Sequence, residues 1–160
     1  MSELPIRAFQ TQDREAVIAL HWALNRHEQT VSGDRALGRG DAEACLADDE
    51  KQMAERGGVA LVAVIDGEVA GYVCCVLAEG GPFLRAELRR QAYVTTLVVG
   101  EVFRGRGVAA ALLGEAERYA REQGVAALGV GVLAGNAGAE RLYRRFGFEP
   151  HAVEMVKRLR

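Results

Sequence analysis

The sequence is poor in cysteine, nearly free of net charge and without a long hydrophobic run. Cys74 and Cys75 are adjacent and Cys45 lies far upstream, so neither a disulfide framework nor a zinc-ligand spacing is present. The net charge of −2 gives no positive field to attract nucleic acid. No run of about 18 apolar residues is available to span a membrane, and the N-terminus lacks the apolar segment of a signal peptide. We therefore expect a cytoplasmic protein with no nucleic-acid or membrane partner and no bound metal.

The composition is that of an ordinary globular domain. Hydrophobic residues make up 49% of the 160 residues and charged residues 26%, which is enough apolar material for a buried core. The chain has no internal repeat, low-complexity tract or linker. We expect residues 1–160 to form a single domain.

Hydrophobic periodicity predicts strands that alternate with helices. Thr11 or Asp13 is expected to cap the first helix and Asp41 the second, and Asp66-Gly67 is a strong hairpin signal. The order of elements predicts an α/β fold with a mixed sheet and crossover helices. In chain order we expect a strand over 4–9, helices over 11–28 and 41–57, two strands within 59–77, a strand over 92–99, a helix over 108–124, a strand over 126–133, a helix within 134–147 and a strand over 151–159.

Arg104, Gly105, Arg106 and Gly107 form a turn between a predicted strand and a predicted helix. Such a turn leaves the first N–H groups of the helix unpaired, and the helix dipole adds positive charge, so the position favours phosphate. The glycines have no Cβ to hold a pyrophosphate off the main chain, and the arginines can add charge-assisted bonds. No Gly-Lys-Ser/Thr follows, and Ala110 replaces the last glycine of a dinucleotide loop. The turn indicates a phosphorylated cofactor; a purely structural turn is the alternative.

Two segments resemble the signatures of the GNAT superfamily of N-acetyltransferases. Residues 104–109 fit its Arg/Gln-x-x-Gly-x-Gly/Ala motif, and Leu97–Val99 resembles the Leu-x-Val strand that precedes that motif. Downstream, Asn136, a short helix carrying Tyr143, and Phe146-Gly147-Phe148 resemble the second signature. The order of elements matches over nearly the whole chain, so the resemblance implies the fold of that family.

The resemblance also implies a cofactor and a reaction. Acetyl-coenzyme A would lie where the parallel strands 92–99 and 126–133 splay apart, and a primary amine would attack it directly without an acyl-enzyme. The pantetheine arm would pair with the backbone of the first strand, and the pyrophosphate would contact the N–H groups of the glycine turn. The cofactor-binding residues implied in this way are Leu97, Val98, Val99, Arg104, Gly105, Arg106, Gly107, Val108, Ala109 and Asn136.

Tyr143 takes the position of the family's general acid, which would protonate the departing thiolate; a packing role in the core is the alternative. A backbone N–H near Val98 would hold the developing oxyanion. Asn136 is expected to be a helix cap, a pantetheine contact, or both. Cys74 and Cys75 are expected to be small buried hydrophobes on opposite faces of the sheet rather than nucleophiles.

The general base is unassigned by the sequence. Many relatives carry a Glu on the first splayed strand, where this chain has Thr95 and Thr96, and others on the second, where it has Gly129 and Gly131. Threonine alone is not a useful base near neutral pH. The remaining candidates, each of which could equally be a solvated or structural group, are Glu28, Glu87, Glu101, His27 and a water chain.

The acceptor pocket is expected beside the first two helices. Glu28, Asp34 and Asp41 could attract a cationic amine or could belong to a solvated acidic surface. His21 and Trp22 could line the pocket, with a core position as the alternative for Trp22. Small amines, amino acids, polyamines, aminoglycosides and protein amines all remain possible acceptors.

The sequence also leaves a non-catalytic function open and predicts an oligomeric state. The alternative to an enzyme is a non-catalytic acyl-coenzyme A sensor or regulatory protein, which would keep the pyrophosphate turn without needing an acid or a base. A homodimer is expected through the predicted C-terminal strand, which could offer a sheet edge.

Overall fold

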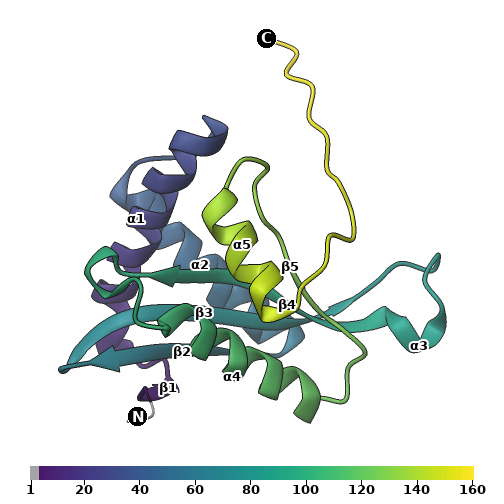
Figure 1. Ribbon diagram of the computed structural model, residues 1–160, viewed down its shortest axis with the longest axis horizontal. Coiled ribbons are helices and arrows are strands. Elements are labelled where there is room, and N and C mark those ends of the chain that lie inside the picture. The colour runs from purple at the N-terminus through teal and green to yellow at the C-terminus, as the bar shows by residue number, and fades with distance from the viewer. Residues whose placement is uncertain (1–3) are drawn as a thin grey trace.

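Five strands form one mixed sheet in the computed structural model, which describes residues 4–160. The strands lie in the order β1-β2-β3-β4-β5 (Figure 1), antiparallel from β1 to β4 and parallel between β4 and β5. The predicted mixed α/β sheet is therefore confirmed. The strands are β1 (Ile6–Ala8), β2 (Gly58–Ile65), β3 (Glu68–Glu79), β4 (Arg90–Val99) and β5 (Leu128–Val130).

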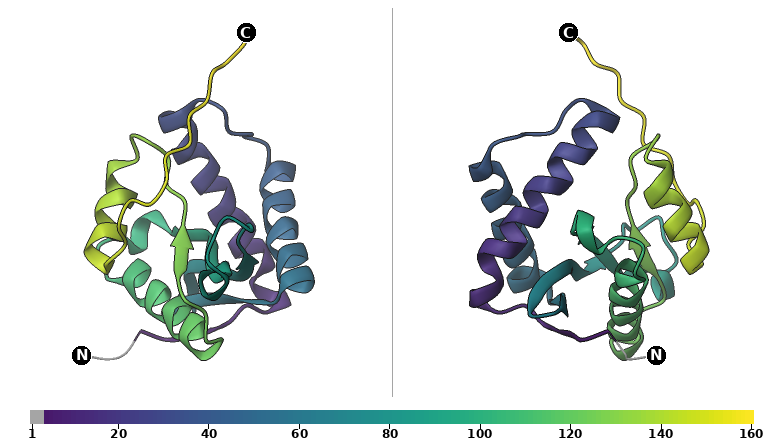
Figure 2. Two further views of the ribbon diagram at one scale, coloured as in Figure 1. Left: turned by 90° about the vertical axis from the view of Figure 1, so that its right-hand side faces the viewer. Right: turned by 60° about the vertical axis from the view of Figure 1, so that its left-hand side comes forward.

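Helices cover both faces of this sheet. The first two long helices pack on one face, and the fourth helix packs on the other with the fifth beside it (Figure 2). Among residues 4–160 no helix has the length and apolar character to cross a membrane. The helices are α1 (Arg14–Ser32), α2 (Arg39–Arg56), α3 (Ala86–Arg89), α4 (Val108–Glu122) and α5 (Ala137–Phe146), with 3₁₀ turns η1 (Thr11–Asp13) and η2 (Glu101–Phe103).

Cys74 and Cys75 show how β3 divides the core into two layers. Both are fully buried, but Cys74 packs with Val17 and Leu46 beneath α1 and α2, whereas Cys75 packs with Leu112 of α4. Successive strand side chains point to opposite faces, which explains the division. Burial raises the pKa of Cys74 to about 12 and that of Cys75 to about 11. Both thiols are thus protonated at neutral pH, and their prediction as buried hydrophobes is confirmed.

Positive φ angles mark the predicted turns. Asp66 and Gly67, at φ 51° and 81°, join β2 to β3, as a type I′ hairpin turn requires. Glycines with positive φ also close two helices: Gly124 follows α4, and Gly147 ends α5. These local predictions are confirmed.

Of the predicted N-caps of the first two helices, Asp13 is confirmed by its position and Asp41 is wrong. Asp13 is the N-cap residue of α1, although its side chain makes no cap hydrogen bond to that helix, and a 3₁₀ turn leads into α1, which continues to Ser32. The second helix begins two residues before Asp41, with Gly38 as its N-cap, and the Asp41 carboxylate accepts the Gly38 N–H at 2.9 Å. In a capping box the side chain at N3 accepts the N–H of the N-cap residue, so a carboxylate near a helix start fits either position.

Two strand predictions near the C-terminus also need correction. Only Leu128–Val130 of the predicted strand 126–133 pairs with β4, because the two strands then separate. Residues 151–160 form no strand and lead away from the sheet (Figure 1). Four large apolar side chains there, Val153, Met155, Val156 and Leu159, are 78–90% exposed. Alternation produces a strand only where the backbone pairs with a sheet edge, and this segment pairs with none of the described strands.

Candidate active site

An opening between β4 and β5 begins where their pairing ends. The parallel ladder runs from Ala92–Leu128 to Val94–Val130 and stops there. From Thr95 onward, no strand of the described residues covers this side of β4, while its other side pairs with β3. The backbone of Leu97–Val99 thus lies on an open edge, which an extended ligand can join by hydrogen bonds.

The glycine turn lies at the far end of this open edge. Gly105 and Gly107 have φ of 75° and 77°, a left-handed conformation that only glycine adopts readily. A Cβ added to either would meet no protein atom within 4 Å, so the backbone faces open space. Val108 begins α4 and is 2% exposed. A Cβ on Gly71 of β3 would come within 2.9 Å of Val108 Cγ1, so this glycine allows the start of the helix to lie close against the sheet.

A cleft of about 420 Å³ opens beside the turn. It is lined by Arg104 and the glycines, by Val99 of β4, and by Leu142 and Arg145 of α5. Neither arginine forms an ion pair with a carboxylate of residues 4–160, and the first turn of α4 holds no acidic residue. Arg106 does not line this cleft, and its guanidinium lies over the Phe103 ring at 5.7 Å. Arg145, which the sequence analysis did not single out, thus joins Arg104 in an electropositive cleft suited to an anion.

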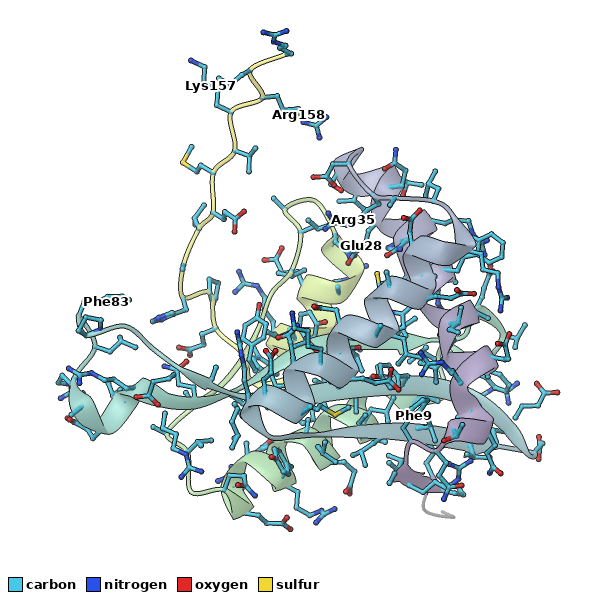
Figure 3. The ribbon with its side chains drawn as sticks, turned by 180° about the vertical axis from the view of Figure 1, so that it is seen from behind. Phe9, Glu28, Arg35, Phe83, Lys157 and Arg158 are labelled. Atoms are coloured by element: carbon cyan, nitrogen blue, oxygen red, sulfur yellow. The ribbon has the colours of Figure 1, made fainter. Side chains whose placement is uncertain are left out.

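Tyr143 on α5 is half-buried and lies edge-on to Phe148, with ring centroids 5.7 Å apart. Burial, then the charge of Glu28 and the neighbouring Tyr93, raises the pKa of Tyr143 to about 12. The hydroxyl is therefore protonated at neutral pH and can donate a proton. Glu28 comes from α1 and forms an ion pair with Arg35 at 2.6 Å (Figure 3).

The other side chains predicted as candidate bases do not lie near Tyr143 as Glu28 does. Glu87 is exposed on α3, 3.6 Å from Arg85, at the end of β4 opposite the glycine turn (Figure 1). Glu101 and His27 are also exposed. Among the four side-chain candidates, Glu28 is the one whose charge acts on Tyr143.

Other predicted site residues have local partners. Asn136 caps α5 by accepting the Ala139 N–H at 3.3 Å, which confirms its role as a cap. Asp34 accepts the Ser32 hydroxyl at 2.5 Å. Trp22 is partly buried against the core, and its Nε1 donates to the Leu37 carbonyl at 2.8 Å.

The glycines of the second splayed strand accommodate the ring of Tyr93. A Cβ on Gly129 would lie 3.0 Å from Tyr93 Cδ2, and one on Gly131 would lie 2.8 Å from its Oη. A glutamate at either position would meet this ring, which is itself 40% exposed. Glycine at positions 129 and 131 therefore leaves room for the Tyr93 ring beside this strand.

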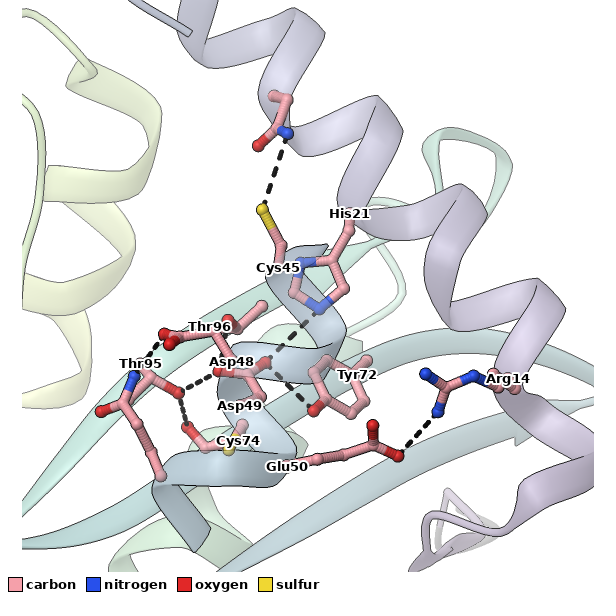
Figure 4. A network of polar contacts seen from close by, with 12 residues as sticks. Arg14, His21, Cys45, Asp48, Asp49, Glu50, Tyr72, Cys74, Thr95 and Thr96 are labelled. Carbon is pink, nitrogen blue, oxygen red and sulfur yellow. Dashed lines mark hydrogen bonds and ion pairs between the residues drawn. The ribbon is translucent and has the colours of Figure 1, made fainter. Parts of the chain in front are cut away.

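A buried carboxylate lies on the opposite side of the site. Asp49 of α2 is 3% exposed and accepts hydrogen bonds from Thr95 Oγ1 at 2.7 Å, Thr96 Oγ1 at 3.2 Å and Tyr72 Oη at 3.1 Å (Figure 4). His21 Nε2 lies 3.4 Å from the same carboxylate. Burial alone would raise the pKa of Asp49, but the nearby His21 imidazole and the hydrogen bonds from Thr95 and Thr96 outweigh it and keep the pKa below its ordinary value.

Sequence reasoning missed Asp49, although a signal was present. Ala42, Leu46, Asp49 and Met53 follow helical spacing on the buried side of α2, so a carboxylate interrupts an apolar stripe. A charge in such a place is rare unless a partner is present. The interpretation that His21 could line the pocket is wrong, because His21 is 2% exposed and lies against Asp49.

Known proteins resemble this chain in sequence. Residues 16–148 match the acetyltransferase (GNAT) family. An uncharacterized N-acetyltransferase of Methanocaldococcus jannaschii is 35% identical over 105 residues, covering 61% of this chain and 44% of that protein. The chain spans less than half the length of the curated relatives it matches.

Solved structures extend the likeness to the whole fold. A mutant protein of Bacillus halodurans has a TM-score of 0.80 at 22% identity, with 98% of this chain and 99% of that chain covered. An aminoglycoside N-acetyltransferase solved in complex with CoA has a TM-score of 0.67 at 19% identity, with 98% and 99% covered. These structures establish the fold that the sequence predicted.

Proposed function

The chain belongs to the acetyltransferase (GNAT) family, and on that premise we propose that it transfers the acetyl group of acetyl-coenzyme A to a primary amine. The observation that carries the proposal is one continuous site: the open edge of β4 leads from Thr95 to the glycine turn and its electropositive cleft. The acceptor attacks directly in a ternary complex. Both buried cysteines have raised pKa values, which fits a reaction without a cysteine acyl-enzyme.

The residues of the cleft fit the cofactor. Its pyrophosphate would take the N–H groups from Arg104 to Ala109 at the start of a 15-residue helix, with Arg104 and Arg145 supplying positive charge. The pantetheine arm would follow the open backbone of Leu97–Val99. Bound in this way, the cofactor supplies an activated acetyl thioester. Asn136 and Arg106 remain predicted contacts, Asn136 in addition to capping α5.

Two groups of this chain have roles in the transfer. A backbone N–H near Val98 would stabilise the negative charge on the thioester oxygen. The Tyr143 hydroxyl, protonated at neutral pH because burial raises its pKa to about 12, would donate a proton to the leaving sulfur. The acceptor is a primary amine of a small molecule or a protein. An aminoglycoside acetyltransferase shares the fold, which makes amine-rich small molecules a first class to try.

The cofactor site is tested by calorimetric titration with coenzyme A and with pantetheine, which lacks the pyrophosphate. Gly107→Glu places bulk and negative charge at the turn, so it should weaken coenzyme A binding by roughly tenfold or more, about 1.4 kcal/mol. Binding of pantetheine should change little.

Gly124→Glu is the matched control. Gly124 also has positive φ, is exposed and has no atom within 4 Å of an added Cβ, but it follows the other end of α4. This variant carries the same backbone strain and should bind coenzyme A like the wild type. Equal binding by Gly107→Glu and the wild type would place the cofactor elsewhere.

The homodimer is proposed through residues 151–160. Their exposed apolar side chains have no cover within the described chain, and a second copy could supply it. Light scattering should report a dimer that is lost when the chain is truncated after Pro150. A monomer at high micromolar concentration would contradict this proposal.

A further inference from the structure

Thr95 occupies a β-bulge in β4. The ladder with β3 pairs Val94 and Thr96 with consecutive residues and leaves Thr95 as the extra residue between them. A bulge interrupts the alternation of side chains, and the hydroxyls of both threonines reach Asp49 on the same face. Two neighbouring strand residues therefore serve one carboxylate (Figure 4).

The two threonines differ in their access to the opening. Pairing between β4 and β5 ends at Val94 and Val130, so Thr95 is the first residue of the open edge. Thr95 is half-buried, whereas Thr96 is only 8% exposed. Thr95 thus joins the opening to the buried carboxylate, and Thr96 contacts the carboxylate from within the core.

The hydrogen bond to Asp49 sets the polarity of the Thr95 hydroxyl. The Thr95 hydroxyl donates its hydrogen bond to the Asp49 carboxylate at 2.7 Å, in preference to the Cys74 carbonyl at 3.4 Å. A hydroxyl has one proton and two acceptor lone pairs, so the lone pairs of Thr95 remain for a donor in the opening. An acceptor amine is such a donor.

Behind Asp49 lies the buried imidazole of His21. His21 Nε2 is buried, has no hydrogen-bond partner among residues 4–160, and lies 3.4 Å from Asp49 Oδ2. The neutral form of an imidazole carries one nitrogen that can accept a proton. Asp49 therefore connects the hydroxyl at the opening to an imidazole in the core.

We propose that Thr95 binds the nitrogen of the acceptor amine and passes the proton that this nitrogen loses to the Asp49–His21 pair. The proposal rests on the proposed acetyl transfer. As the carbon–nitrogen bond forms, the nitrogen gives a proton to Thr95 Oγ1, whose own proton moves to Asp49 and can continue to His21. As the carbon–sulfur bond breaks, the sulfur keeps the bonding electrons and takes the Tyr143 proton. Solvent then returns one proton from the pair to Tyr143, and the charges balance.

In this reaction Thr95 is the catalytic residue, and Asp49 and His21 are positioning residues that act through it. Asp49 of α2 thereby takes the role of the glutamate that many relatives carry on the strand equivalent to β4. A threonine that is a poor base alone becomes a relay when a buried carboxylate accepts its proton. The alternative is a purely structural role, in which the hydrogen bonds of Asp49 only hold α2 against the sheet.

Three variants distinguish a proton relay through Thr95 from a purely structural role of Asp49. Thr95→Val keeps the shape of the side chain and removes the hydroxyl, and Thr95→Ser keeps the hydroxyl. Thr96→Val is the matched control, because it removes the other threonine bond to Asp49 from a buried position. Kinetics with an amine that the wild type acetylates, melting temperatures and coenzyme A titrations are measured for each. Thr95→Ala repeats the test if the valine variant does not fold.

The relay predicts that Thr95→Val lowers kcat by about 10²–10⁴-fold, as loss of a general base does, while coenzyme A affinity is kept. Thr95→Ser should restore most of the rate, and Thr96→Val should melt lower but turn over close to the wild type. Equal kcat losses for the two valine variants, or none for Thr95→Val, would overturn the inference. A wild type that binds coenzyme A but acetylates no amine would overturn the proposed transfer, and the relay with it.

Discussion

At the residue scale, the hydroxyl of Tyr143 distinguishes a general acid from a core side chain. Tyr143→Phe keeps the ring that packs against Phe148 and removes only the proton donor. If Tyr143 protonates the leaving sulfur, kcat should fall by about 10²–10⁴-fold, while coenzyme A affinity and melting temperature stay nearly constant. Steady-state kinetics and thermal unfolding of the same preparation measure both quantities.

A purely structural role of the Tyr143 hydroxyl would change stability and not the rate. If the hydroxyl is only a packing group, its loss should cost about 0.5–1.5 kcal/mol of stability and leave kcat almost unchanged. A variant that melts lower and works at full rate would remove Tyr143 from the reaction.

At the scale of elements, the junction of β1 and α1 depends on the buried carboxylate of Asp13. It accepts two bonds from the Arg7 guanidinium, at 2.7 and 2.8 Å, and one from the Gln10 N–H at 2.8 Å. The bonds from Arg7, aided by that from Gln10, keep the pKa of Asp13 below its ordinary value despite burial. The charged form of Asp13 is therefore the form that stabilises the fold.

The sign of the pH dependence follows from this shift. A carboxyl with a lower pKa in the folded state contributes its stability above the unfolded pKa, about 3.9, and loses it as the pH falls through the folded pKa. Asp13→Asn should lower the free energy of unfolding by about 1.5–3 kcal/mol at pH 7, and the difference from the wild type should shrink in acid.

Urea unfolding at neutral and acidic pH measures this change. Asp48→Asn is the control, since Asp48 is an exposed carboxylate on α2 that is bonded to Gln52, and its replacement should have little effect at either pH. A difference between Asp13→Asn and the wild type that stays constant into acid would contradict the assigned role.

Elements with local causes were predictable from the sequence, and those with distant causes were not. The hairpin at Asp66-Gly67 and the glycine turn follow from backbone preferences that act within a few residues. The relation of Asp49 to Thr95 depends on a bulge and on chain segments 46 positions apart, which no local pattern encodes. The alternating tail, 151–160, failed as a strand because alternation does not say whether the backbone will pair with a sheet edge.

At the scale of the whole molecule, the sheet brings together groups from both of its faces at one opening. Asp49 and Glu28 come from the helices on one face, whereas the glycine turn leads into α4 on the other (Figure 2). Tyr143 lies on α5, and the charge of Glu28 acts on it across the opening. The family match over residues 16–148 includes every one of these positions. The single-domain boundary, 1–160, and a cytoplasmic location remain predictions.

The central claim is acetyl transfer to an amine, and a screen of an amine panel with acetyl-coenzyme A tests it most directly. The panel should include amino acids, polyamines, aminoglycosides and peptides, with release of the coenzyme A thiol and the mass of the product read together. We expect enzyme-dependent thiol release matched by an acetylated amine for at least one class, and slower release with Tyr143→Phe. Tight coenzyme A binding without any acetylated amine would contradict the claim and would indicate a non-catalytic acyl-coenzyme A-binding protein.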